Sequence, residues 1–591
     1  MNAVSPVETL VTDHLDLWTT ALKRKSTAGR GSSSKVELYG IRKLRELILE
    51  LAVRGLLVPQ DPNDEPASEL LKRIAAERAK LLKEGRIKKG KPLPSIAGGS
   101  KQLPPGWSWT CMAALGEISP RNEAKDDVIA SFVPMPLIST RFDGRHDHES
   151  TTWAEIKKGY THFADGDVAI AKITPCFENS KAAIFSGLHN GIGAGTTELH
   201  VVRPIGEFVS RSYLLLYLKS PPFLRVGETK MTGSAGQKRV PTEFFSFNPL
   251  PLPPLAEQHR IVAKVDELMA LCDQLEQETE ASLDAHQTLV EALLSALTSA
   301  ADHAQFASAW QRIAGYFDTL FTTEESIAQI KQTILQLAVM GKLVPQDPND
   351  KPASELLKKI AAEKAKLVKE GKLNADKLLQ PAGKKKMPFE SPLGWEWCRI
   401  ETICDVQGGI QKQPIRTPKL NHYPYLRVAN VQRGYIDTTE MERFELFDDE
   451  LRTRALQPGD ILVVEGNGSE DEIGRCAIWN GQIDQCVFQN HLIRVRSIIQ
   501  GNEVFISKFL NSPPGIDEMK RLAVTTSGLY NLSVGKIRSI SVPLPPLAEQ
   551  HRIVAKVDEL MALCDQLKSR LSAAQTTQLH LADALVEQAI G

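Results

Sequence analysis

The sequence predicts an α+β multidomain protein with an internal pseudo-two-fold repeat, in which an antiparallel pair of long coiled-coil helices separates two mixed α/β domains. Three observations support this fold class. The chain has 591 residues, too many for one hydrophobic core. The segment PLPPLAEQHRIVAKVDELMALCDQL occurs at residues 251–275 and again, unchanged, at 543–567. Within that segment the hydrophobic residues recur with heptad spacing.

Two further repeated segments complete the duplicated unit. Residues 51–85 and 337–371 differ at six of 35 positions, and PPGWSW at 104–109 corresponds to PLGWEW at 392–397. The middle segments between these frames cannot be aligned beyond their edges. Near-identical frames around dissimilar middle segments suggest that the frames share one mechanical task and that the middle segments perform two different recognition tasks. A recent duplication whose middle segments diverged faster is the alternative.

The repeated 25-residue segment predicts a long amphipathic helix. Pro253 and Pro254 suit a helix start, and Glu257 places a negative charge in the first turn. Each helix is expected to run about 40 residues, on the order of 60 Å. The predicted seam consists of Ile261, Val265, Leu268, Cys272 and Leu275 in the first copy and Ile553, Val557, Leu560, Cys564 and Leu567 in the second. Each helix needs a partner for this seam, and its own duplicate packed antiparallel is the simplest one; a helical hairpin within a common core is the alternative.

The segment after LVPQDPND predicts a basic helix in each copy. Asp64 or Ser68, and in the second copy Asp350 or Ser354, are candidate N-caps. Between Lys72 and Lys91 nine Lys and Arg residues face two Glu, and residues 358–386 hold ten Lys against three acids. Such a run is usually a solvated helix face, but it also suits contact with phosphates or with an acidic partner.

The middle segments predict short strands joined by polar, glycine-containing loops. The expected strands are DVAIAKI at 167–173, ELHVVRP at 198–204, PYLRVANV at 424–431 and GDILVVEG at 459–466. Several loops combine Lys or Arg with amide and hydroxyl side chains, which hold phosphates and read base edges. Turns favour the same residues for backbone reasons, so a single loop is weak evidence.

These loops supply the candidate DNA-contacting residues. In the first middle segment they are Lys172, Thr174, Lys181, Ser234, Gln237, Lys238 and Arg239. In the second they are Gln411, Lys412, Arg427, Asn467, Ser469, Arg475, Tyr530, Asn531 and Lys536. The net charge of −1 is the sum of basic and acidic stretches, so it does not argue against a nucleic-acid partner.

Composition indicates a cytoplasmic protein. Hydrophobic residues make up 42% and charged residues 24%, as in soluble globular chains. Asp13 and Asp16 lie where a signal peptide needs an apolar run, and no segment predicts a membrane span. The eight cysteines form no CxxC pair, so reduced thiols and no metal site are expected.

The motifs of the relevant enzymes are missing from the sequence. The NPLPLPP segment at 248–254 lacks the aromatic residue of an adenine methyltransferase loop, and no Gly-Lys pair continues into the Ser or Thr of a phosphate loop. Glu155 and Lys157, downstream of Asp143 or Asp147, imitate a nuclease pattern that arises freely in a charged chain. His259 and His551 are interpreted as surface residues. No catalytic residue is predicted.

The sequence closely resembles the specificity subunits of type I restriction-modification systems, over essentially the whole chain. The resemblance rests on the duplicated PLPPLAEQHRIV and LAVxGxLVPQDPND segments, the GWxW motifs, and KITPCFENSK and VEGNGS in the middle segments. It implies two target recognition domains, near residues 104–250 and 392–542, each reading one half of a split, asymmetric site in double-stranded DNA. It also implies that the repeated helices form a spacer on which two methyltransferase (modification) subunits dock.

The resemblance assigns the chemistry to other chains. It implies that this chain binds no cofactor, that S-adenosylmethionine, ATP and Mg are used by partner subunits, and that restriction/translocase subunits join the full complex. The expected divisions are an N-terminal helical region with basic linker (1–103), the first recognition domain (104–253), a central spacer helix (254–300), a helical region and basic linker (301–391), the second recognition domain (392–545) and a C-terminal spacer helix (546–591).

Two other functions stay open on the sequence. One is a self-contained DNA methyltransferase or nuclease with an unrecognised active site, against which the missing motifs count. The other is a coiled-coil adaptor without a nucleic-acid role, which would leave two dissimilar polar-looped segments in identical frames unexplained.

Overall fold

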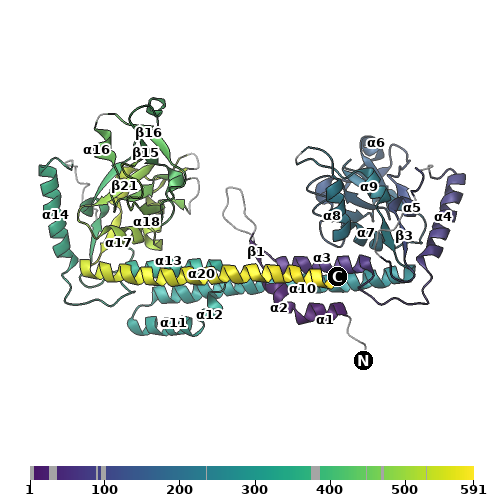
Figure 1. Ribbon diagram of the computed structural model, residues 1–591, viewed down its shortest axis with the longest axis horizontal. Helices are drawn as coiled ribbons and strands as arrows, with labels where there is room; N and C mark the ends of the chain where they lie inside the picture. The colour runs from purple at the N-terminus through teal and green to yellow at the C-terminus, as the bar shows by residue number, and fades with distance from the viewer. Residues whose placement is uncertain are drawn as a thin grey trace. The chain divides into compact units, whose positions relative to one another are not determined.

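The computed structural model describes residues 6–24, 36–87, 91–94, 102–234, 236–373, 387–447, 449–467, 472–526 and 529–590 (Figure 1). The chain divides into two compact units. Unit 1 comprises Met1–Thr27, Ser32–Ser282 and Ala574–Gly591, and unit 2 comprises Ala28–Gly31 and Leu283–Ala573. Each unit contains one middle segment together with parts of two long helices.

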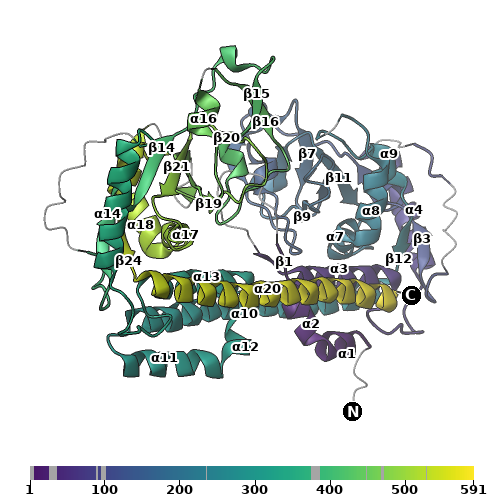
Figure 2. The same ribbon diagram turned by 60° about the vertical axis from the view of Figure 1, so that its left-hand side comes forward.

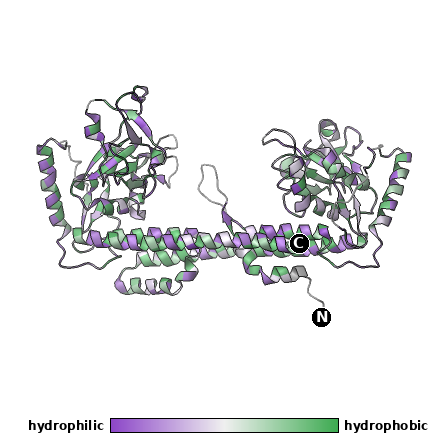
Figure 3. Cartoon of the chain, in the orientation of Figure 1, coloured by the Kyte–Doolittle hydropathy of each residue, from purple (hydrophilic) through white to green (hydrophobic). Residues whose placement is uncertain are grey.

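The long helices α10 (Leu255–Ser299) and α20 (Leu547–Ile590) are 45 and 44 residues long. Both exceed the predicted length and correspond to about 65 Å each. Hydrophobic and hydrophilic residues alternate along them in stripes (Figure 3). Each begins directly after a Pro-Pro pair, with a glutamate in its first turn, as the sequence predicts.

Helix α3 (Tyr39–Arg54) shows that the two long helices are antiparallel in unit 1. Along α3, successive contacts with α20 occur at increasing residue numbers of α20. Successive contacts with α10 occur at decreasing residue numbers of α10. In order along α3 and the turn after it, these contacts join Tyr39 to Asp583 (2.7 Å), Arg45 to Asp273 (2.5 Å), Arg54 to the carbonyl of Ile590 (2.9 Å) and Gln60 to Glu257 (3.2 Å). Because α3 is parallel to α20 and antiparallel to α10, the two long helices run in opposite directions.

Helix α13 (Glu324–Val339) gives the same result independently in unit 2. Here the helix is antiparallel to α20 and parallel to α10. In order along α13 and the turn after it, the contacts join Glu324 to Lys568 (3.6 Å), Gln329 to Glu291 (3.1 Å), Lys331 to Asp565, Lys342 to the carbonyl of Thr298 (2.8 Å) and Gln346 to Glu549 (3.3 Å). The predicted fold class, with its antiparallel helix pair, is confirmed.

The seam residues differ in burial between the two copies. In unit 1, Leu268 is 3% exposed and all five seam residues are buried. In unit 2, Leu560 and Leu567 are half-buried although the surrounding sequence is identical. The difference therefore arises from what packs against the helix and not from the helix itself.

The remaining helices of unit 1 are α1 (Pro6–Asp13), α2 (Leu15–Thr20), α4 (Ala67–Lys83), α5 (Met112–Leu115), α6 (Trp153–Ile156), α7 (Arg211–Lys219), α8 (Pro221–Lys230) and α9 (Thr242–Phe247). Its strands are β1 (Lys23–Arg24), β2 (Val36–Glu37), β3 (Ser108–Thr110), β4 (Gly116–Ile118), β5 (Ile129–Val133), β6 (Glu149–Thr152), β7 (Thr161–Ala164), β8 (Val168–Ala171), β9 (Ala182–Ile184), β10 (Ile192–Gly195), β11 (Leu199–Pro204) and β12 (Leu250–Leu252).

The remaining helices of unit 2 are α11 (His303–Gly315), α12 (Phe317–Leu320), α14 (Ala353–Lys369), α15 (Ile400–Ile403), α16 (Glu450–Arg454), α17 (Glu503–Leu510), α18 (Pro513–Leu522) and α19 (Val534–Ser539). Its strands are β13 (Glu396–Arg399), β14 (Cys404–Gly408), β15 (His422–Leu426), β16 (Glu442–Glu445), β17 (Ile461–Val464), β18 (Gly466–Asn467), β19 (Cys476–Ile478), β20 (Val487–Phe488), β21 (Leu492–Ser497), β22 (Val524–Thr526), β23 (Leu529–Asn531) and β24 (Ser541–Leu544).

The two middle segments share a topology although their sequences do not align. In unit 1 a sheet of order β4-β11-β8-β9 lies beside a mixed sheet of order β6-β5-β10-β7. In unit 2 the order β14-β21-β17-β19 repeats the first sheet, and β16-β15-β20 forms the mixed one. The register is equivalent as well, since Leu199 pairs with Ala171 where Leu492 pairs with Val464. The duplicated unit therefore includes the middle segments at the level of the fold.

Two local predictions are wrong. The strand predicted over 424–431 ends at Leu426, because buried Asn430 accepts a hydrogen bond from the backbone N–H of Arg427 (2.8 Å) and thereby closes a 3₁₀ turn, Val428–Asn430. Helix α4 begins after Pro66, and neither Asp64 nor Ser68 caps it. In the second copy α14 begins after Pro352 in the same way, so Asp350 and Ser354 are not caps either.

A buried hydrogen bond between a tryptophan and a glutamate, here called the latch, joins each middle segment to its frame. The contacts around the latch also explain where α4 and α14 begin. In unit 1 the indole N–H of Trp107 donates to Glu257 Oε2 at 3.0 Å, and Gln60 donates to the other carboxylate oxygen at 3.2 Å. Asp64 pairs with Arg260 at 2.6 Å and so is not available as a cap. The backbone N–H of Ala67 donates instead to the carbonyl of Gly106 (2.8 Å). A tertiary hydrogen bond thus replaces the local cap.

Unit 2 contains the same latch. Trp395 donates to Glu549 Oε2 at 3.0 Å, and Gln346 donates to the same carboxylate at 3.3 Å. Arg552 pairs with Asp350 at 2.7 Å. Burial raises the pKa of Glu257 and of Glu549 alike. The frames therefore hold two dissimilar domains by identical contacts.

Candidate nucleic-acid interface

The first loop cluster, residues 172–181 and 231–240, lies at one end of the β4-β11-β8-β9 sheet. The chain leaves β8 at Ala171 and meets the returning hairpin through hydrogen bonds on both sides. The backbone N–H of Thr174 donates to the carbonyl of Lys238 (3.0 Å), and that of Val240 donates to the carbonyl of Lys172 (2.8 Å). Two loops that are 64 residues apart thus form one surface.

Exposed polar side chains cover this first loop cluster. Ser234, Gln237 and Lys238 are exposed, and the guanidinium of Arg239 forms a bidentate ion pair with Glu198 (2.9 Å). Hydrogen bonds from Arg239 lower the pKa of Glu198, which keeps this carboxylate charged at neutral pH. The sequence does not reveal Glu198, because nothing in its neighbourhood distinguishes it from other surface glutamates.

Two candidate residues of the first domain have contacts inside the domain. Half-buried Lys181 donates from Nζ to the carbonyl of Met135 at 2.9 Å. The hydroxyl of Thr174 accepts from the backbone N–H of Lys238 at 3.1 Å and so joins the two loops. Both residues therefore support the loop cluster, whereas Lys172 lies at its base, where it is half-buried.

The second loop cluster, residues 466–467, 524–526 and 529–536, occupies the equivalent end of the sheet in unit 2. Strands β18, β23 and β22 pair side by side, so that Asn467 lies opposite Tyr530 and Gly466 opposite Asn531. Lys536 donates from Nζ to the carbonyl of Asn531 at 3.2 Å. The backbone of Asn467 lies in this sheet, and the structure does not describe its side chain. Ser469 lies outside the described residues.

Two further candidate cations of unit 2 converge on one carboxylate. Lys412 and Arg427 approach the two oxygens of Glu442 at 3.1 and 2.7 Å, and the hydroxyl of Tyr425 donates to it as well. Hydrogen bonds from Tyr425 and Lys412 lower the pKa of Glu442. A cavity of about 360 Å³ opens here, and its further polar lining includes Gln413, Arg416, Thr417 and Arg443. Gln411 is exposed next to it.

Arg475 links the parts of the second domain. Its guanidinium donates to the carbonyl of Val428 at 2.9 Å and pairs with Glu472 at 3.1 Å. Only 15% of the side chain is exposed. Arg475 therefore holds the 3₁₀ turn after Arg427 against the loop that follows β17.

A buried histidine, His200, lies beneath the first loop cluster. We expect it to make the stability of the first domain depend on pH. His200 hydrogen-bonds through Nε2 to the carbonyl of Val240 (2.9 Å), and burial lowers its pKa to about 4, well below the usual 6.5. The folded state therefore binds fewer protons than the unfolded state between these values. His200 therefore does not lower the free energy of unfolding of the first domain above pH 6.5. This free energy is expected to fall by up to about 3 kcal/mol as the pH drops to 4.

The second domain supplies the matched variant for this prediction. The residue equivalent to His200 in the sheet register is Ile493, which is 1% exposed. His200→Ile is expected to flatten the pH dependence of urea unfolding between pH 6.5 and 4.5, whatever its effect at pH 7. An unchanged slope in the variant would show that other groups cause the acid sensitivity.

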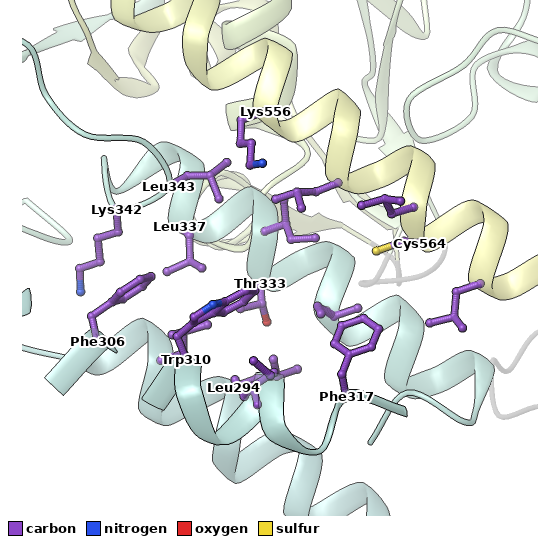
Figure 4. A pocket seen from close by; sticks show the side chains of 18 of the residues that line it. Leu294, Phe306, Trp310, Phe317, Thr333, Leu337, Lys342, Leu343, Lys556 and Cys564 are labelled. Carbon is purple, nitrogen blue, oxygen red and sulfur yellow. The ribbon is translucent and has the colours of Figure 1, made fainter. Parts of the chain in front are cut away.

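A separate apolar groove lies among the helices of unit 2 (Figure 4). It has a volume of about 640 Å³ and is lined by α10, α11, α13 and α20, for example by Leu294, Trp310, Leu337 and Leu560. Trp310 is 46% exposed and Leu563 54%. Cations at its rim are Lys342, Lys556 and Arg570. This groove is where the second copy of the seam is less buried than the first.

The nuclease-like residues of the sequence are not brought together. Glu155 accepts a hydrogen bond from Thr151, whereas Lys157 pairs with Asp126 at 2.5 Å and Asp143 with Arg145 at 3.4 Å. Within the described ranges, no group of three His, Cys, Asp or Glu side chains has the geometry to hold a metal ion. All eight cysteines are free thiols. In the part of the chain that the structure describes, no helix has the length and apolar character needed to span a membrane.

Comparison with known proteins identifies the family. The model of the type I restriction modification DNA specificity domain matches residues 147–285 and 392–574. The chain is 52% identical to the type I restriction enzyme EcoAI specificity subunit of Escherichia coli over 99% of this chain and 100% of the relative. The EcoEI specificity subunit of the same species is also 52% identical, with the same coverage.

A chain in a solved structure of the type I R-M system aligns with a TM-score of 0.49 and 18% identity, over 83% of this chain and 99% of that chain. The identity over the whole length of the two Escherichia coli relatives, together with the two matched domains, establishes the relationship. The chain belongs to the family of type I restriction-modification DNA specificity subunits.

Proposed function

We propose that the chain selects the DNA sequence for a type I restriction-modification complex and performs no chemistry itself. Each domain, at residues 104–250 and 392–542, reads one half of a split, asymmetric site in double-stranded DNA. The observation that carries this proposal is the position of the two loop clusters at equivalent ends of equivalent sheets. A shared scaffold that presents different side chains suits the reading of two different half-sites.

The long helices are proposed to dock two methyltransferase subunits. The apolar groove of unit 2 supports docking of one of them there, because Trp310 and Leu563 expose apolar surface that a partner helix would cover. The partner subunits supply S-adenosylmethionine-dependent methylation, and restriction/translocase subunits supply ATP- and Mg-dependent translocation and cleavage. The complex works in the cytoplasm.

A DNA titration of the purified chain tests the proposal. Lys238→Ala is expected to lower the slope of log affinity against log salt by about one, because it removes one phosphate contact. Gln237→Ala is expected to relax the preference at a single base position, at a cost of about 1–3 kcal/mol. Lys125→Ala, an exposed lysine outside both loop clusters, is the control.

The same titration separates the alternatives. The chain is expected to leave DNA unmodified and uncut when S-adenosylmethionine, ATP and Mg²⁺ are supplied. Turnover by the isolated chain would establish a self-contained enzyme. Binding without any salt-dependent sequence preference would establish an adaptor.

A further inference from the structure

The basic helices α4 and α14 carry the same exposed face in both units. They are identical at 14 of 17 positions, and the three differences keep a cation as a cation or replace Leu82 by Val368. Only three positions of each helix are buried, namely Ala67, Leu70 and Ile74 in α4 and Ala353, Leu356 and Ile360 in α14. Packing against the protein therefore explains few of the shared residues.

The exposed face is a cationic stripe. On α4, Lys72, Arg73, Lys80 and Lys83 fall within about 100° of arc at 3.6 residues per turn, and Glu69 lies in the same arc. Nearby glutamates partly neutralise the stripe, because Lys72 pairs with Glu69 at 2.7 Å, Arg73 with Glu65 at 2.5 Å and Lys80 with Glu77 at 3.5 Å. Each helix has five cations against two glutamates. Exposed alanines, among them Ala76 and its equivalent Ala362, lie between the cations and leave room for a flat surface to approach.

The exposure of the stripe is equal in the two units. The side chain of Lys72 is 72% exposed and that of Lys80 is 62% exposed. The equivalent Lys358 and Lys366 are 72% and 61% exposed. The stripe is therefore exposed to the same degree in both units, although the middle segments beside these helices cannot be aligned.

Helix α4 is attached at the end of the sheet opposite to the first loop cluster. In unit 1, Arg78 of α4 donates to the carbonyl of Gly116 at 2.7 Å, and Gly116 pairs with Pro204 at one end of β11. The first loop cluster leaves the sheet at the opposite end of β11, beside Leu199. Five strand steps, about 17 Å, separate the two ends. Helix α4 stands beside α5 and β3 at its end of the domain (Figure 1).

Unit 2 repeats this arrangement. Lys364 of α14 donates to the carbonyl of Glu401 at 2.5 Å. Glu401 lies just before Cys404, which pairs with Ser497 at the end of β21 opposite to the second loop cluster. Figure 2 shows α14 beside β24 and β14. DNA bound at the loop clusters therefore contacts the end of each sheet opposite to the end at which α4 or α14 is attached.

We infer that the exposed faces of α4 and α14 are two equivalent docking surfaces for two copies of one protein partner with an acidic surface. The inference rests on the proposed function, in which the two copies are the methyltransferase subunits. Duplicated cations suit a duplicated partner, because identical copies need identical contacts. Complementary charge steers association and fixes orientation, and both effects weaken with salt.

Charge reversal tests the surface on the full-length chain. Lys72→Glu, Lys80→Glu and Lys83→Glu are combined on α4, and Lys358→Glu, Lys366→Glu and Lys369→Glu on α14. The probe is the purified methyltransferase subunit of the same system, with stoichiometry measured by native mass spectrometry. Each triple variant is expected to bind its copy about ten- to a hundredfold more weakly, so that one copy remains. The combination of both is expected to lose both copies.

Controls make the outcomes distinguishable. Lys125→Glu with Lys158→Glu, exposed cations outside these helices, is expected to keep two copies. The same six lysines changed to alanine are expected to act in the same direction with smaller effect, which keeps the test valid if a reversal variant fails to fold. Unchanged stoichiometry with weaker DNA binding would make the stripe a phosphate contact and overturn the inference. No change in either measurement would make it a solvated face, which also overturns it.

The proposed function has its own readout in this experiment. The isolated wild-type chain is titrated with DNA in parallel, without any partner. Loss of sequence preference there contradicts the proposed function whatever the stoichiometry. Retained preference in the α4 and α14 variants, together with a lost partner, supports the docking surface alone.

Discussion

Glu442→Gln is expected to strengthen sequence-independent DNA binding by about fivefold, at roughly 0.15 M salt, for each of the two cations that it frees. Glu442 holds Lys412 and Arg427 at 3.1 and 2.7 Å, so neither ammonium nor guanidinium is fully available to a phosphate. A glutamine retains the shape and an acceptor for Tyr425 but loses the charge. The slope of log affinity against log salt should steepen by about 0.9 per freed cation, and discrimination between specific and random DNA should fall.

The first domain provides the parallel test. Glu198→Gln frees Arg239, its one bidentate partner, and should give about half the change in slope. Glu440→Gln is the control, because its carboxylate is 89% exposed and lies 3.9 Å from Arg427. Weaker DNA binding by the Glu442 variant would contradict this prediction and would show that the carboxylate orients the cations for base contact.

Glu257→Ala is expected to destabilise unit 1 by about 3 kcal/mol. The variant removes the acceptor of the Trp107 indole N–H and of Gln60, and leaves a buried donor without a partner. Glu257→Gln keeps an acceptor for the Trp107 indole N–H but presents an amide N–H to the donor Gln60, so it should cost less than Glu257→Ala, about 1–2 kcal/mol. Hydrogen exchange of peptides around residue 107, with urea unfolding, measures the effect.

Glu549→Ala should produce the same loss in unit 2, since Trp395 and Gln346 make the same contacts. His259→Ala, on the exposed side of the same helix turn as Glu257, is the control and should change stability by less than about 0.5 kcal/mol. Equal effects of Glu257→Ala and His259→Ala would mean that the latch does not hold the domain to its frame.

The helical frame could be predicted from the sequence because its signals are local or repeated. Heptad spacing fixed the long helices, and exact repetition showed that the chain is duplicated. The prediction failed where a distant group outcompeted a local one. Asp64 has the chemistry of an N-cap, but Arg260 engages it and Gly106 serves the helix start instead. No local sequence pattern shows that Arg260, 196 residues away, binds Asp64.

The candidate interface was predictable only in part. The structure brings the loops of Lys172, Lys238 and Arg239 together, and contact of these residues with DNA stays a prediction. The carboxylates Glu198 and Glu442 were missed, because a glutamate far along the chain shows its partner only after folding. Lys181 and Arg475 have the residue types of phosphate contacts, yet both hydrogen-bond to carbonyls inside their domains.

The duplicated latch has a consequence for heredity. Because Trp107 and Trp395 meet identical partners, the boundary of one domain is chemically indistinguishable from that of the other. A crossover between two related genes within the coding sequence of residues 251–275 therefore exchanges the second domain with its frame, without altering a contact of the latch. New combinations of half-sites can thus arise in a single recombination event, with no intermediate in which the frame must adapt.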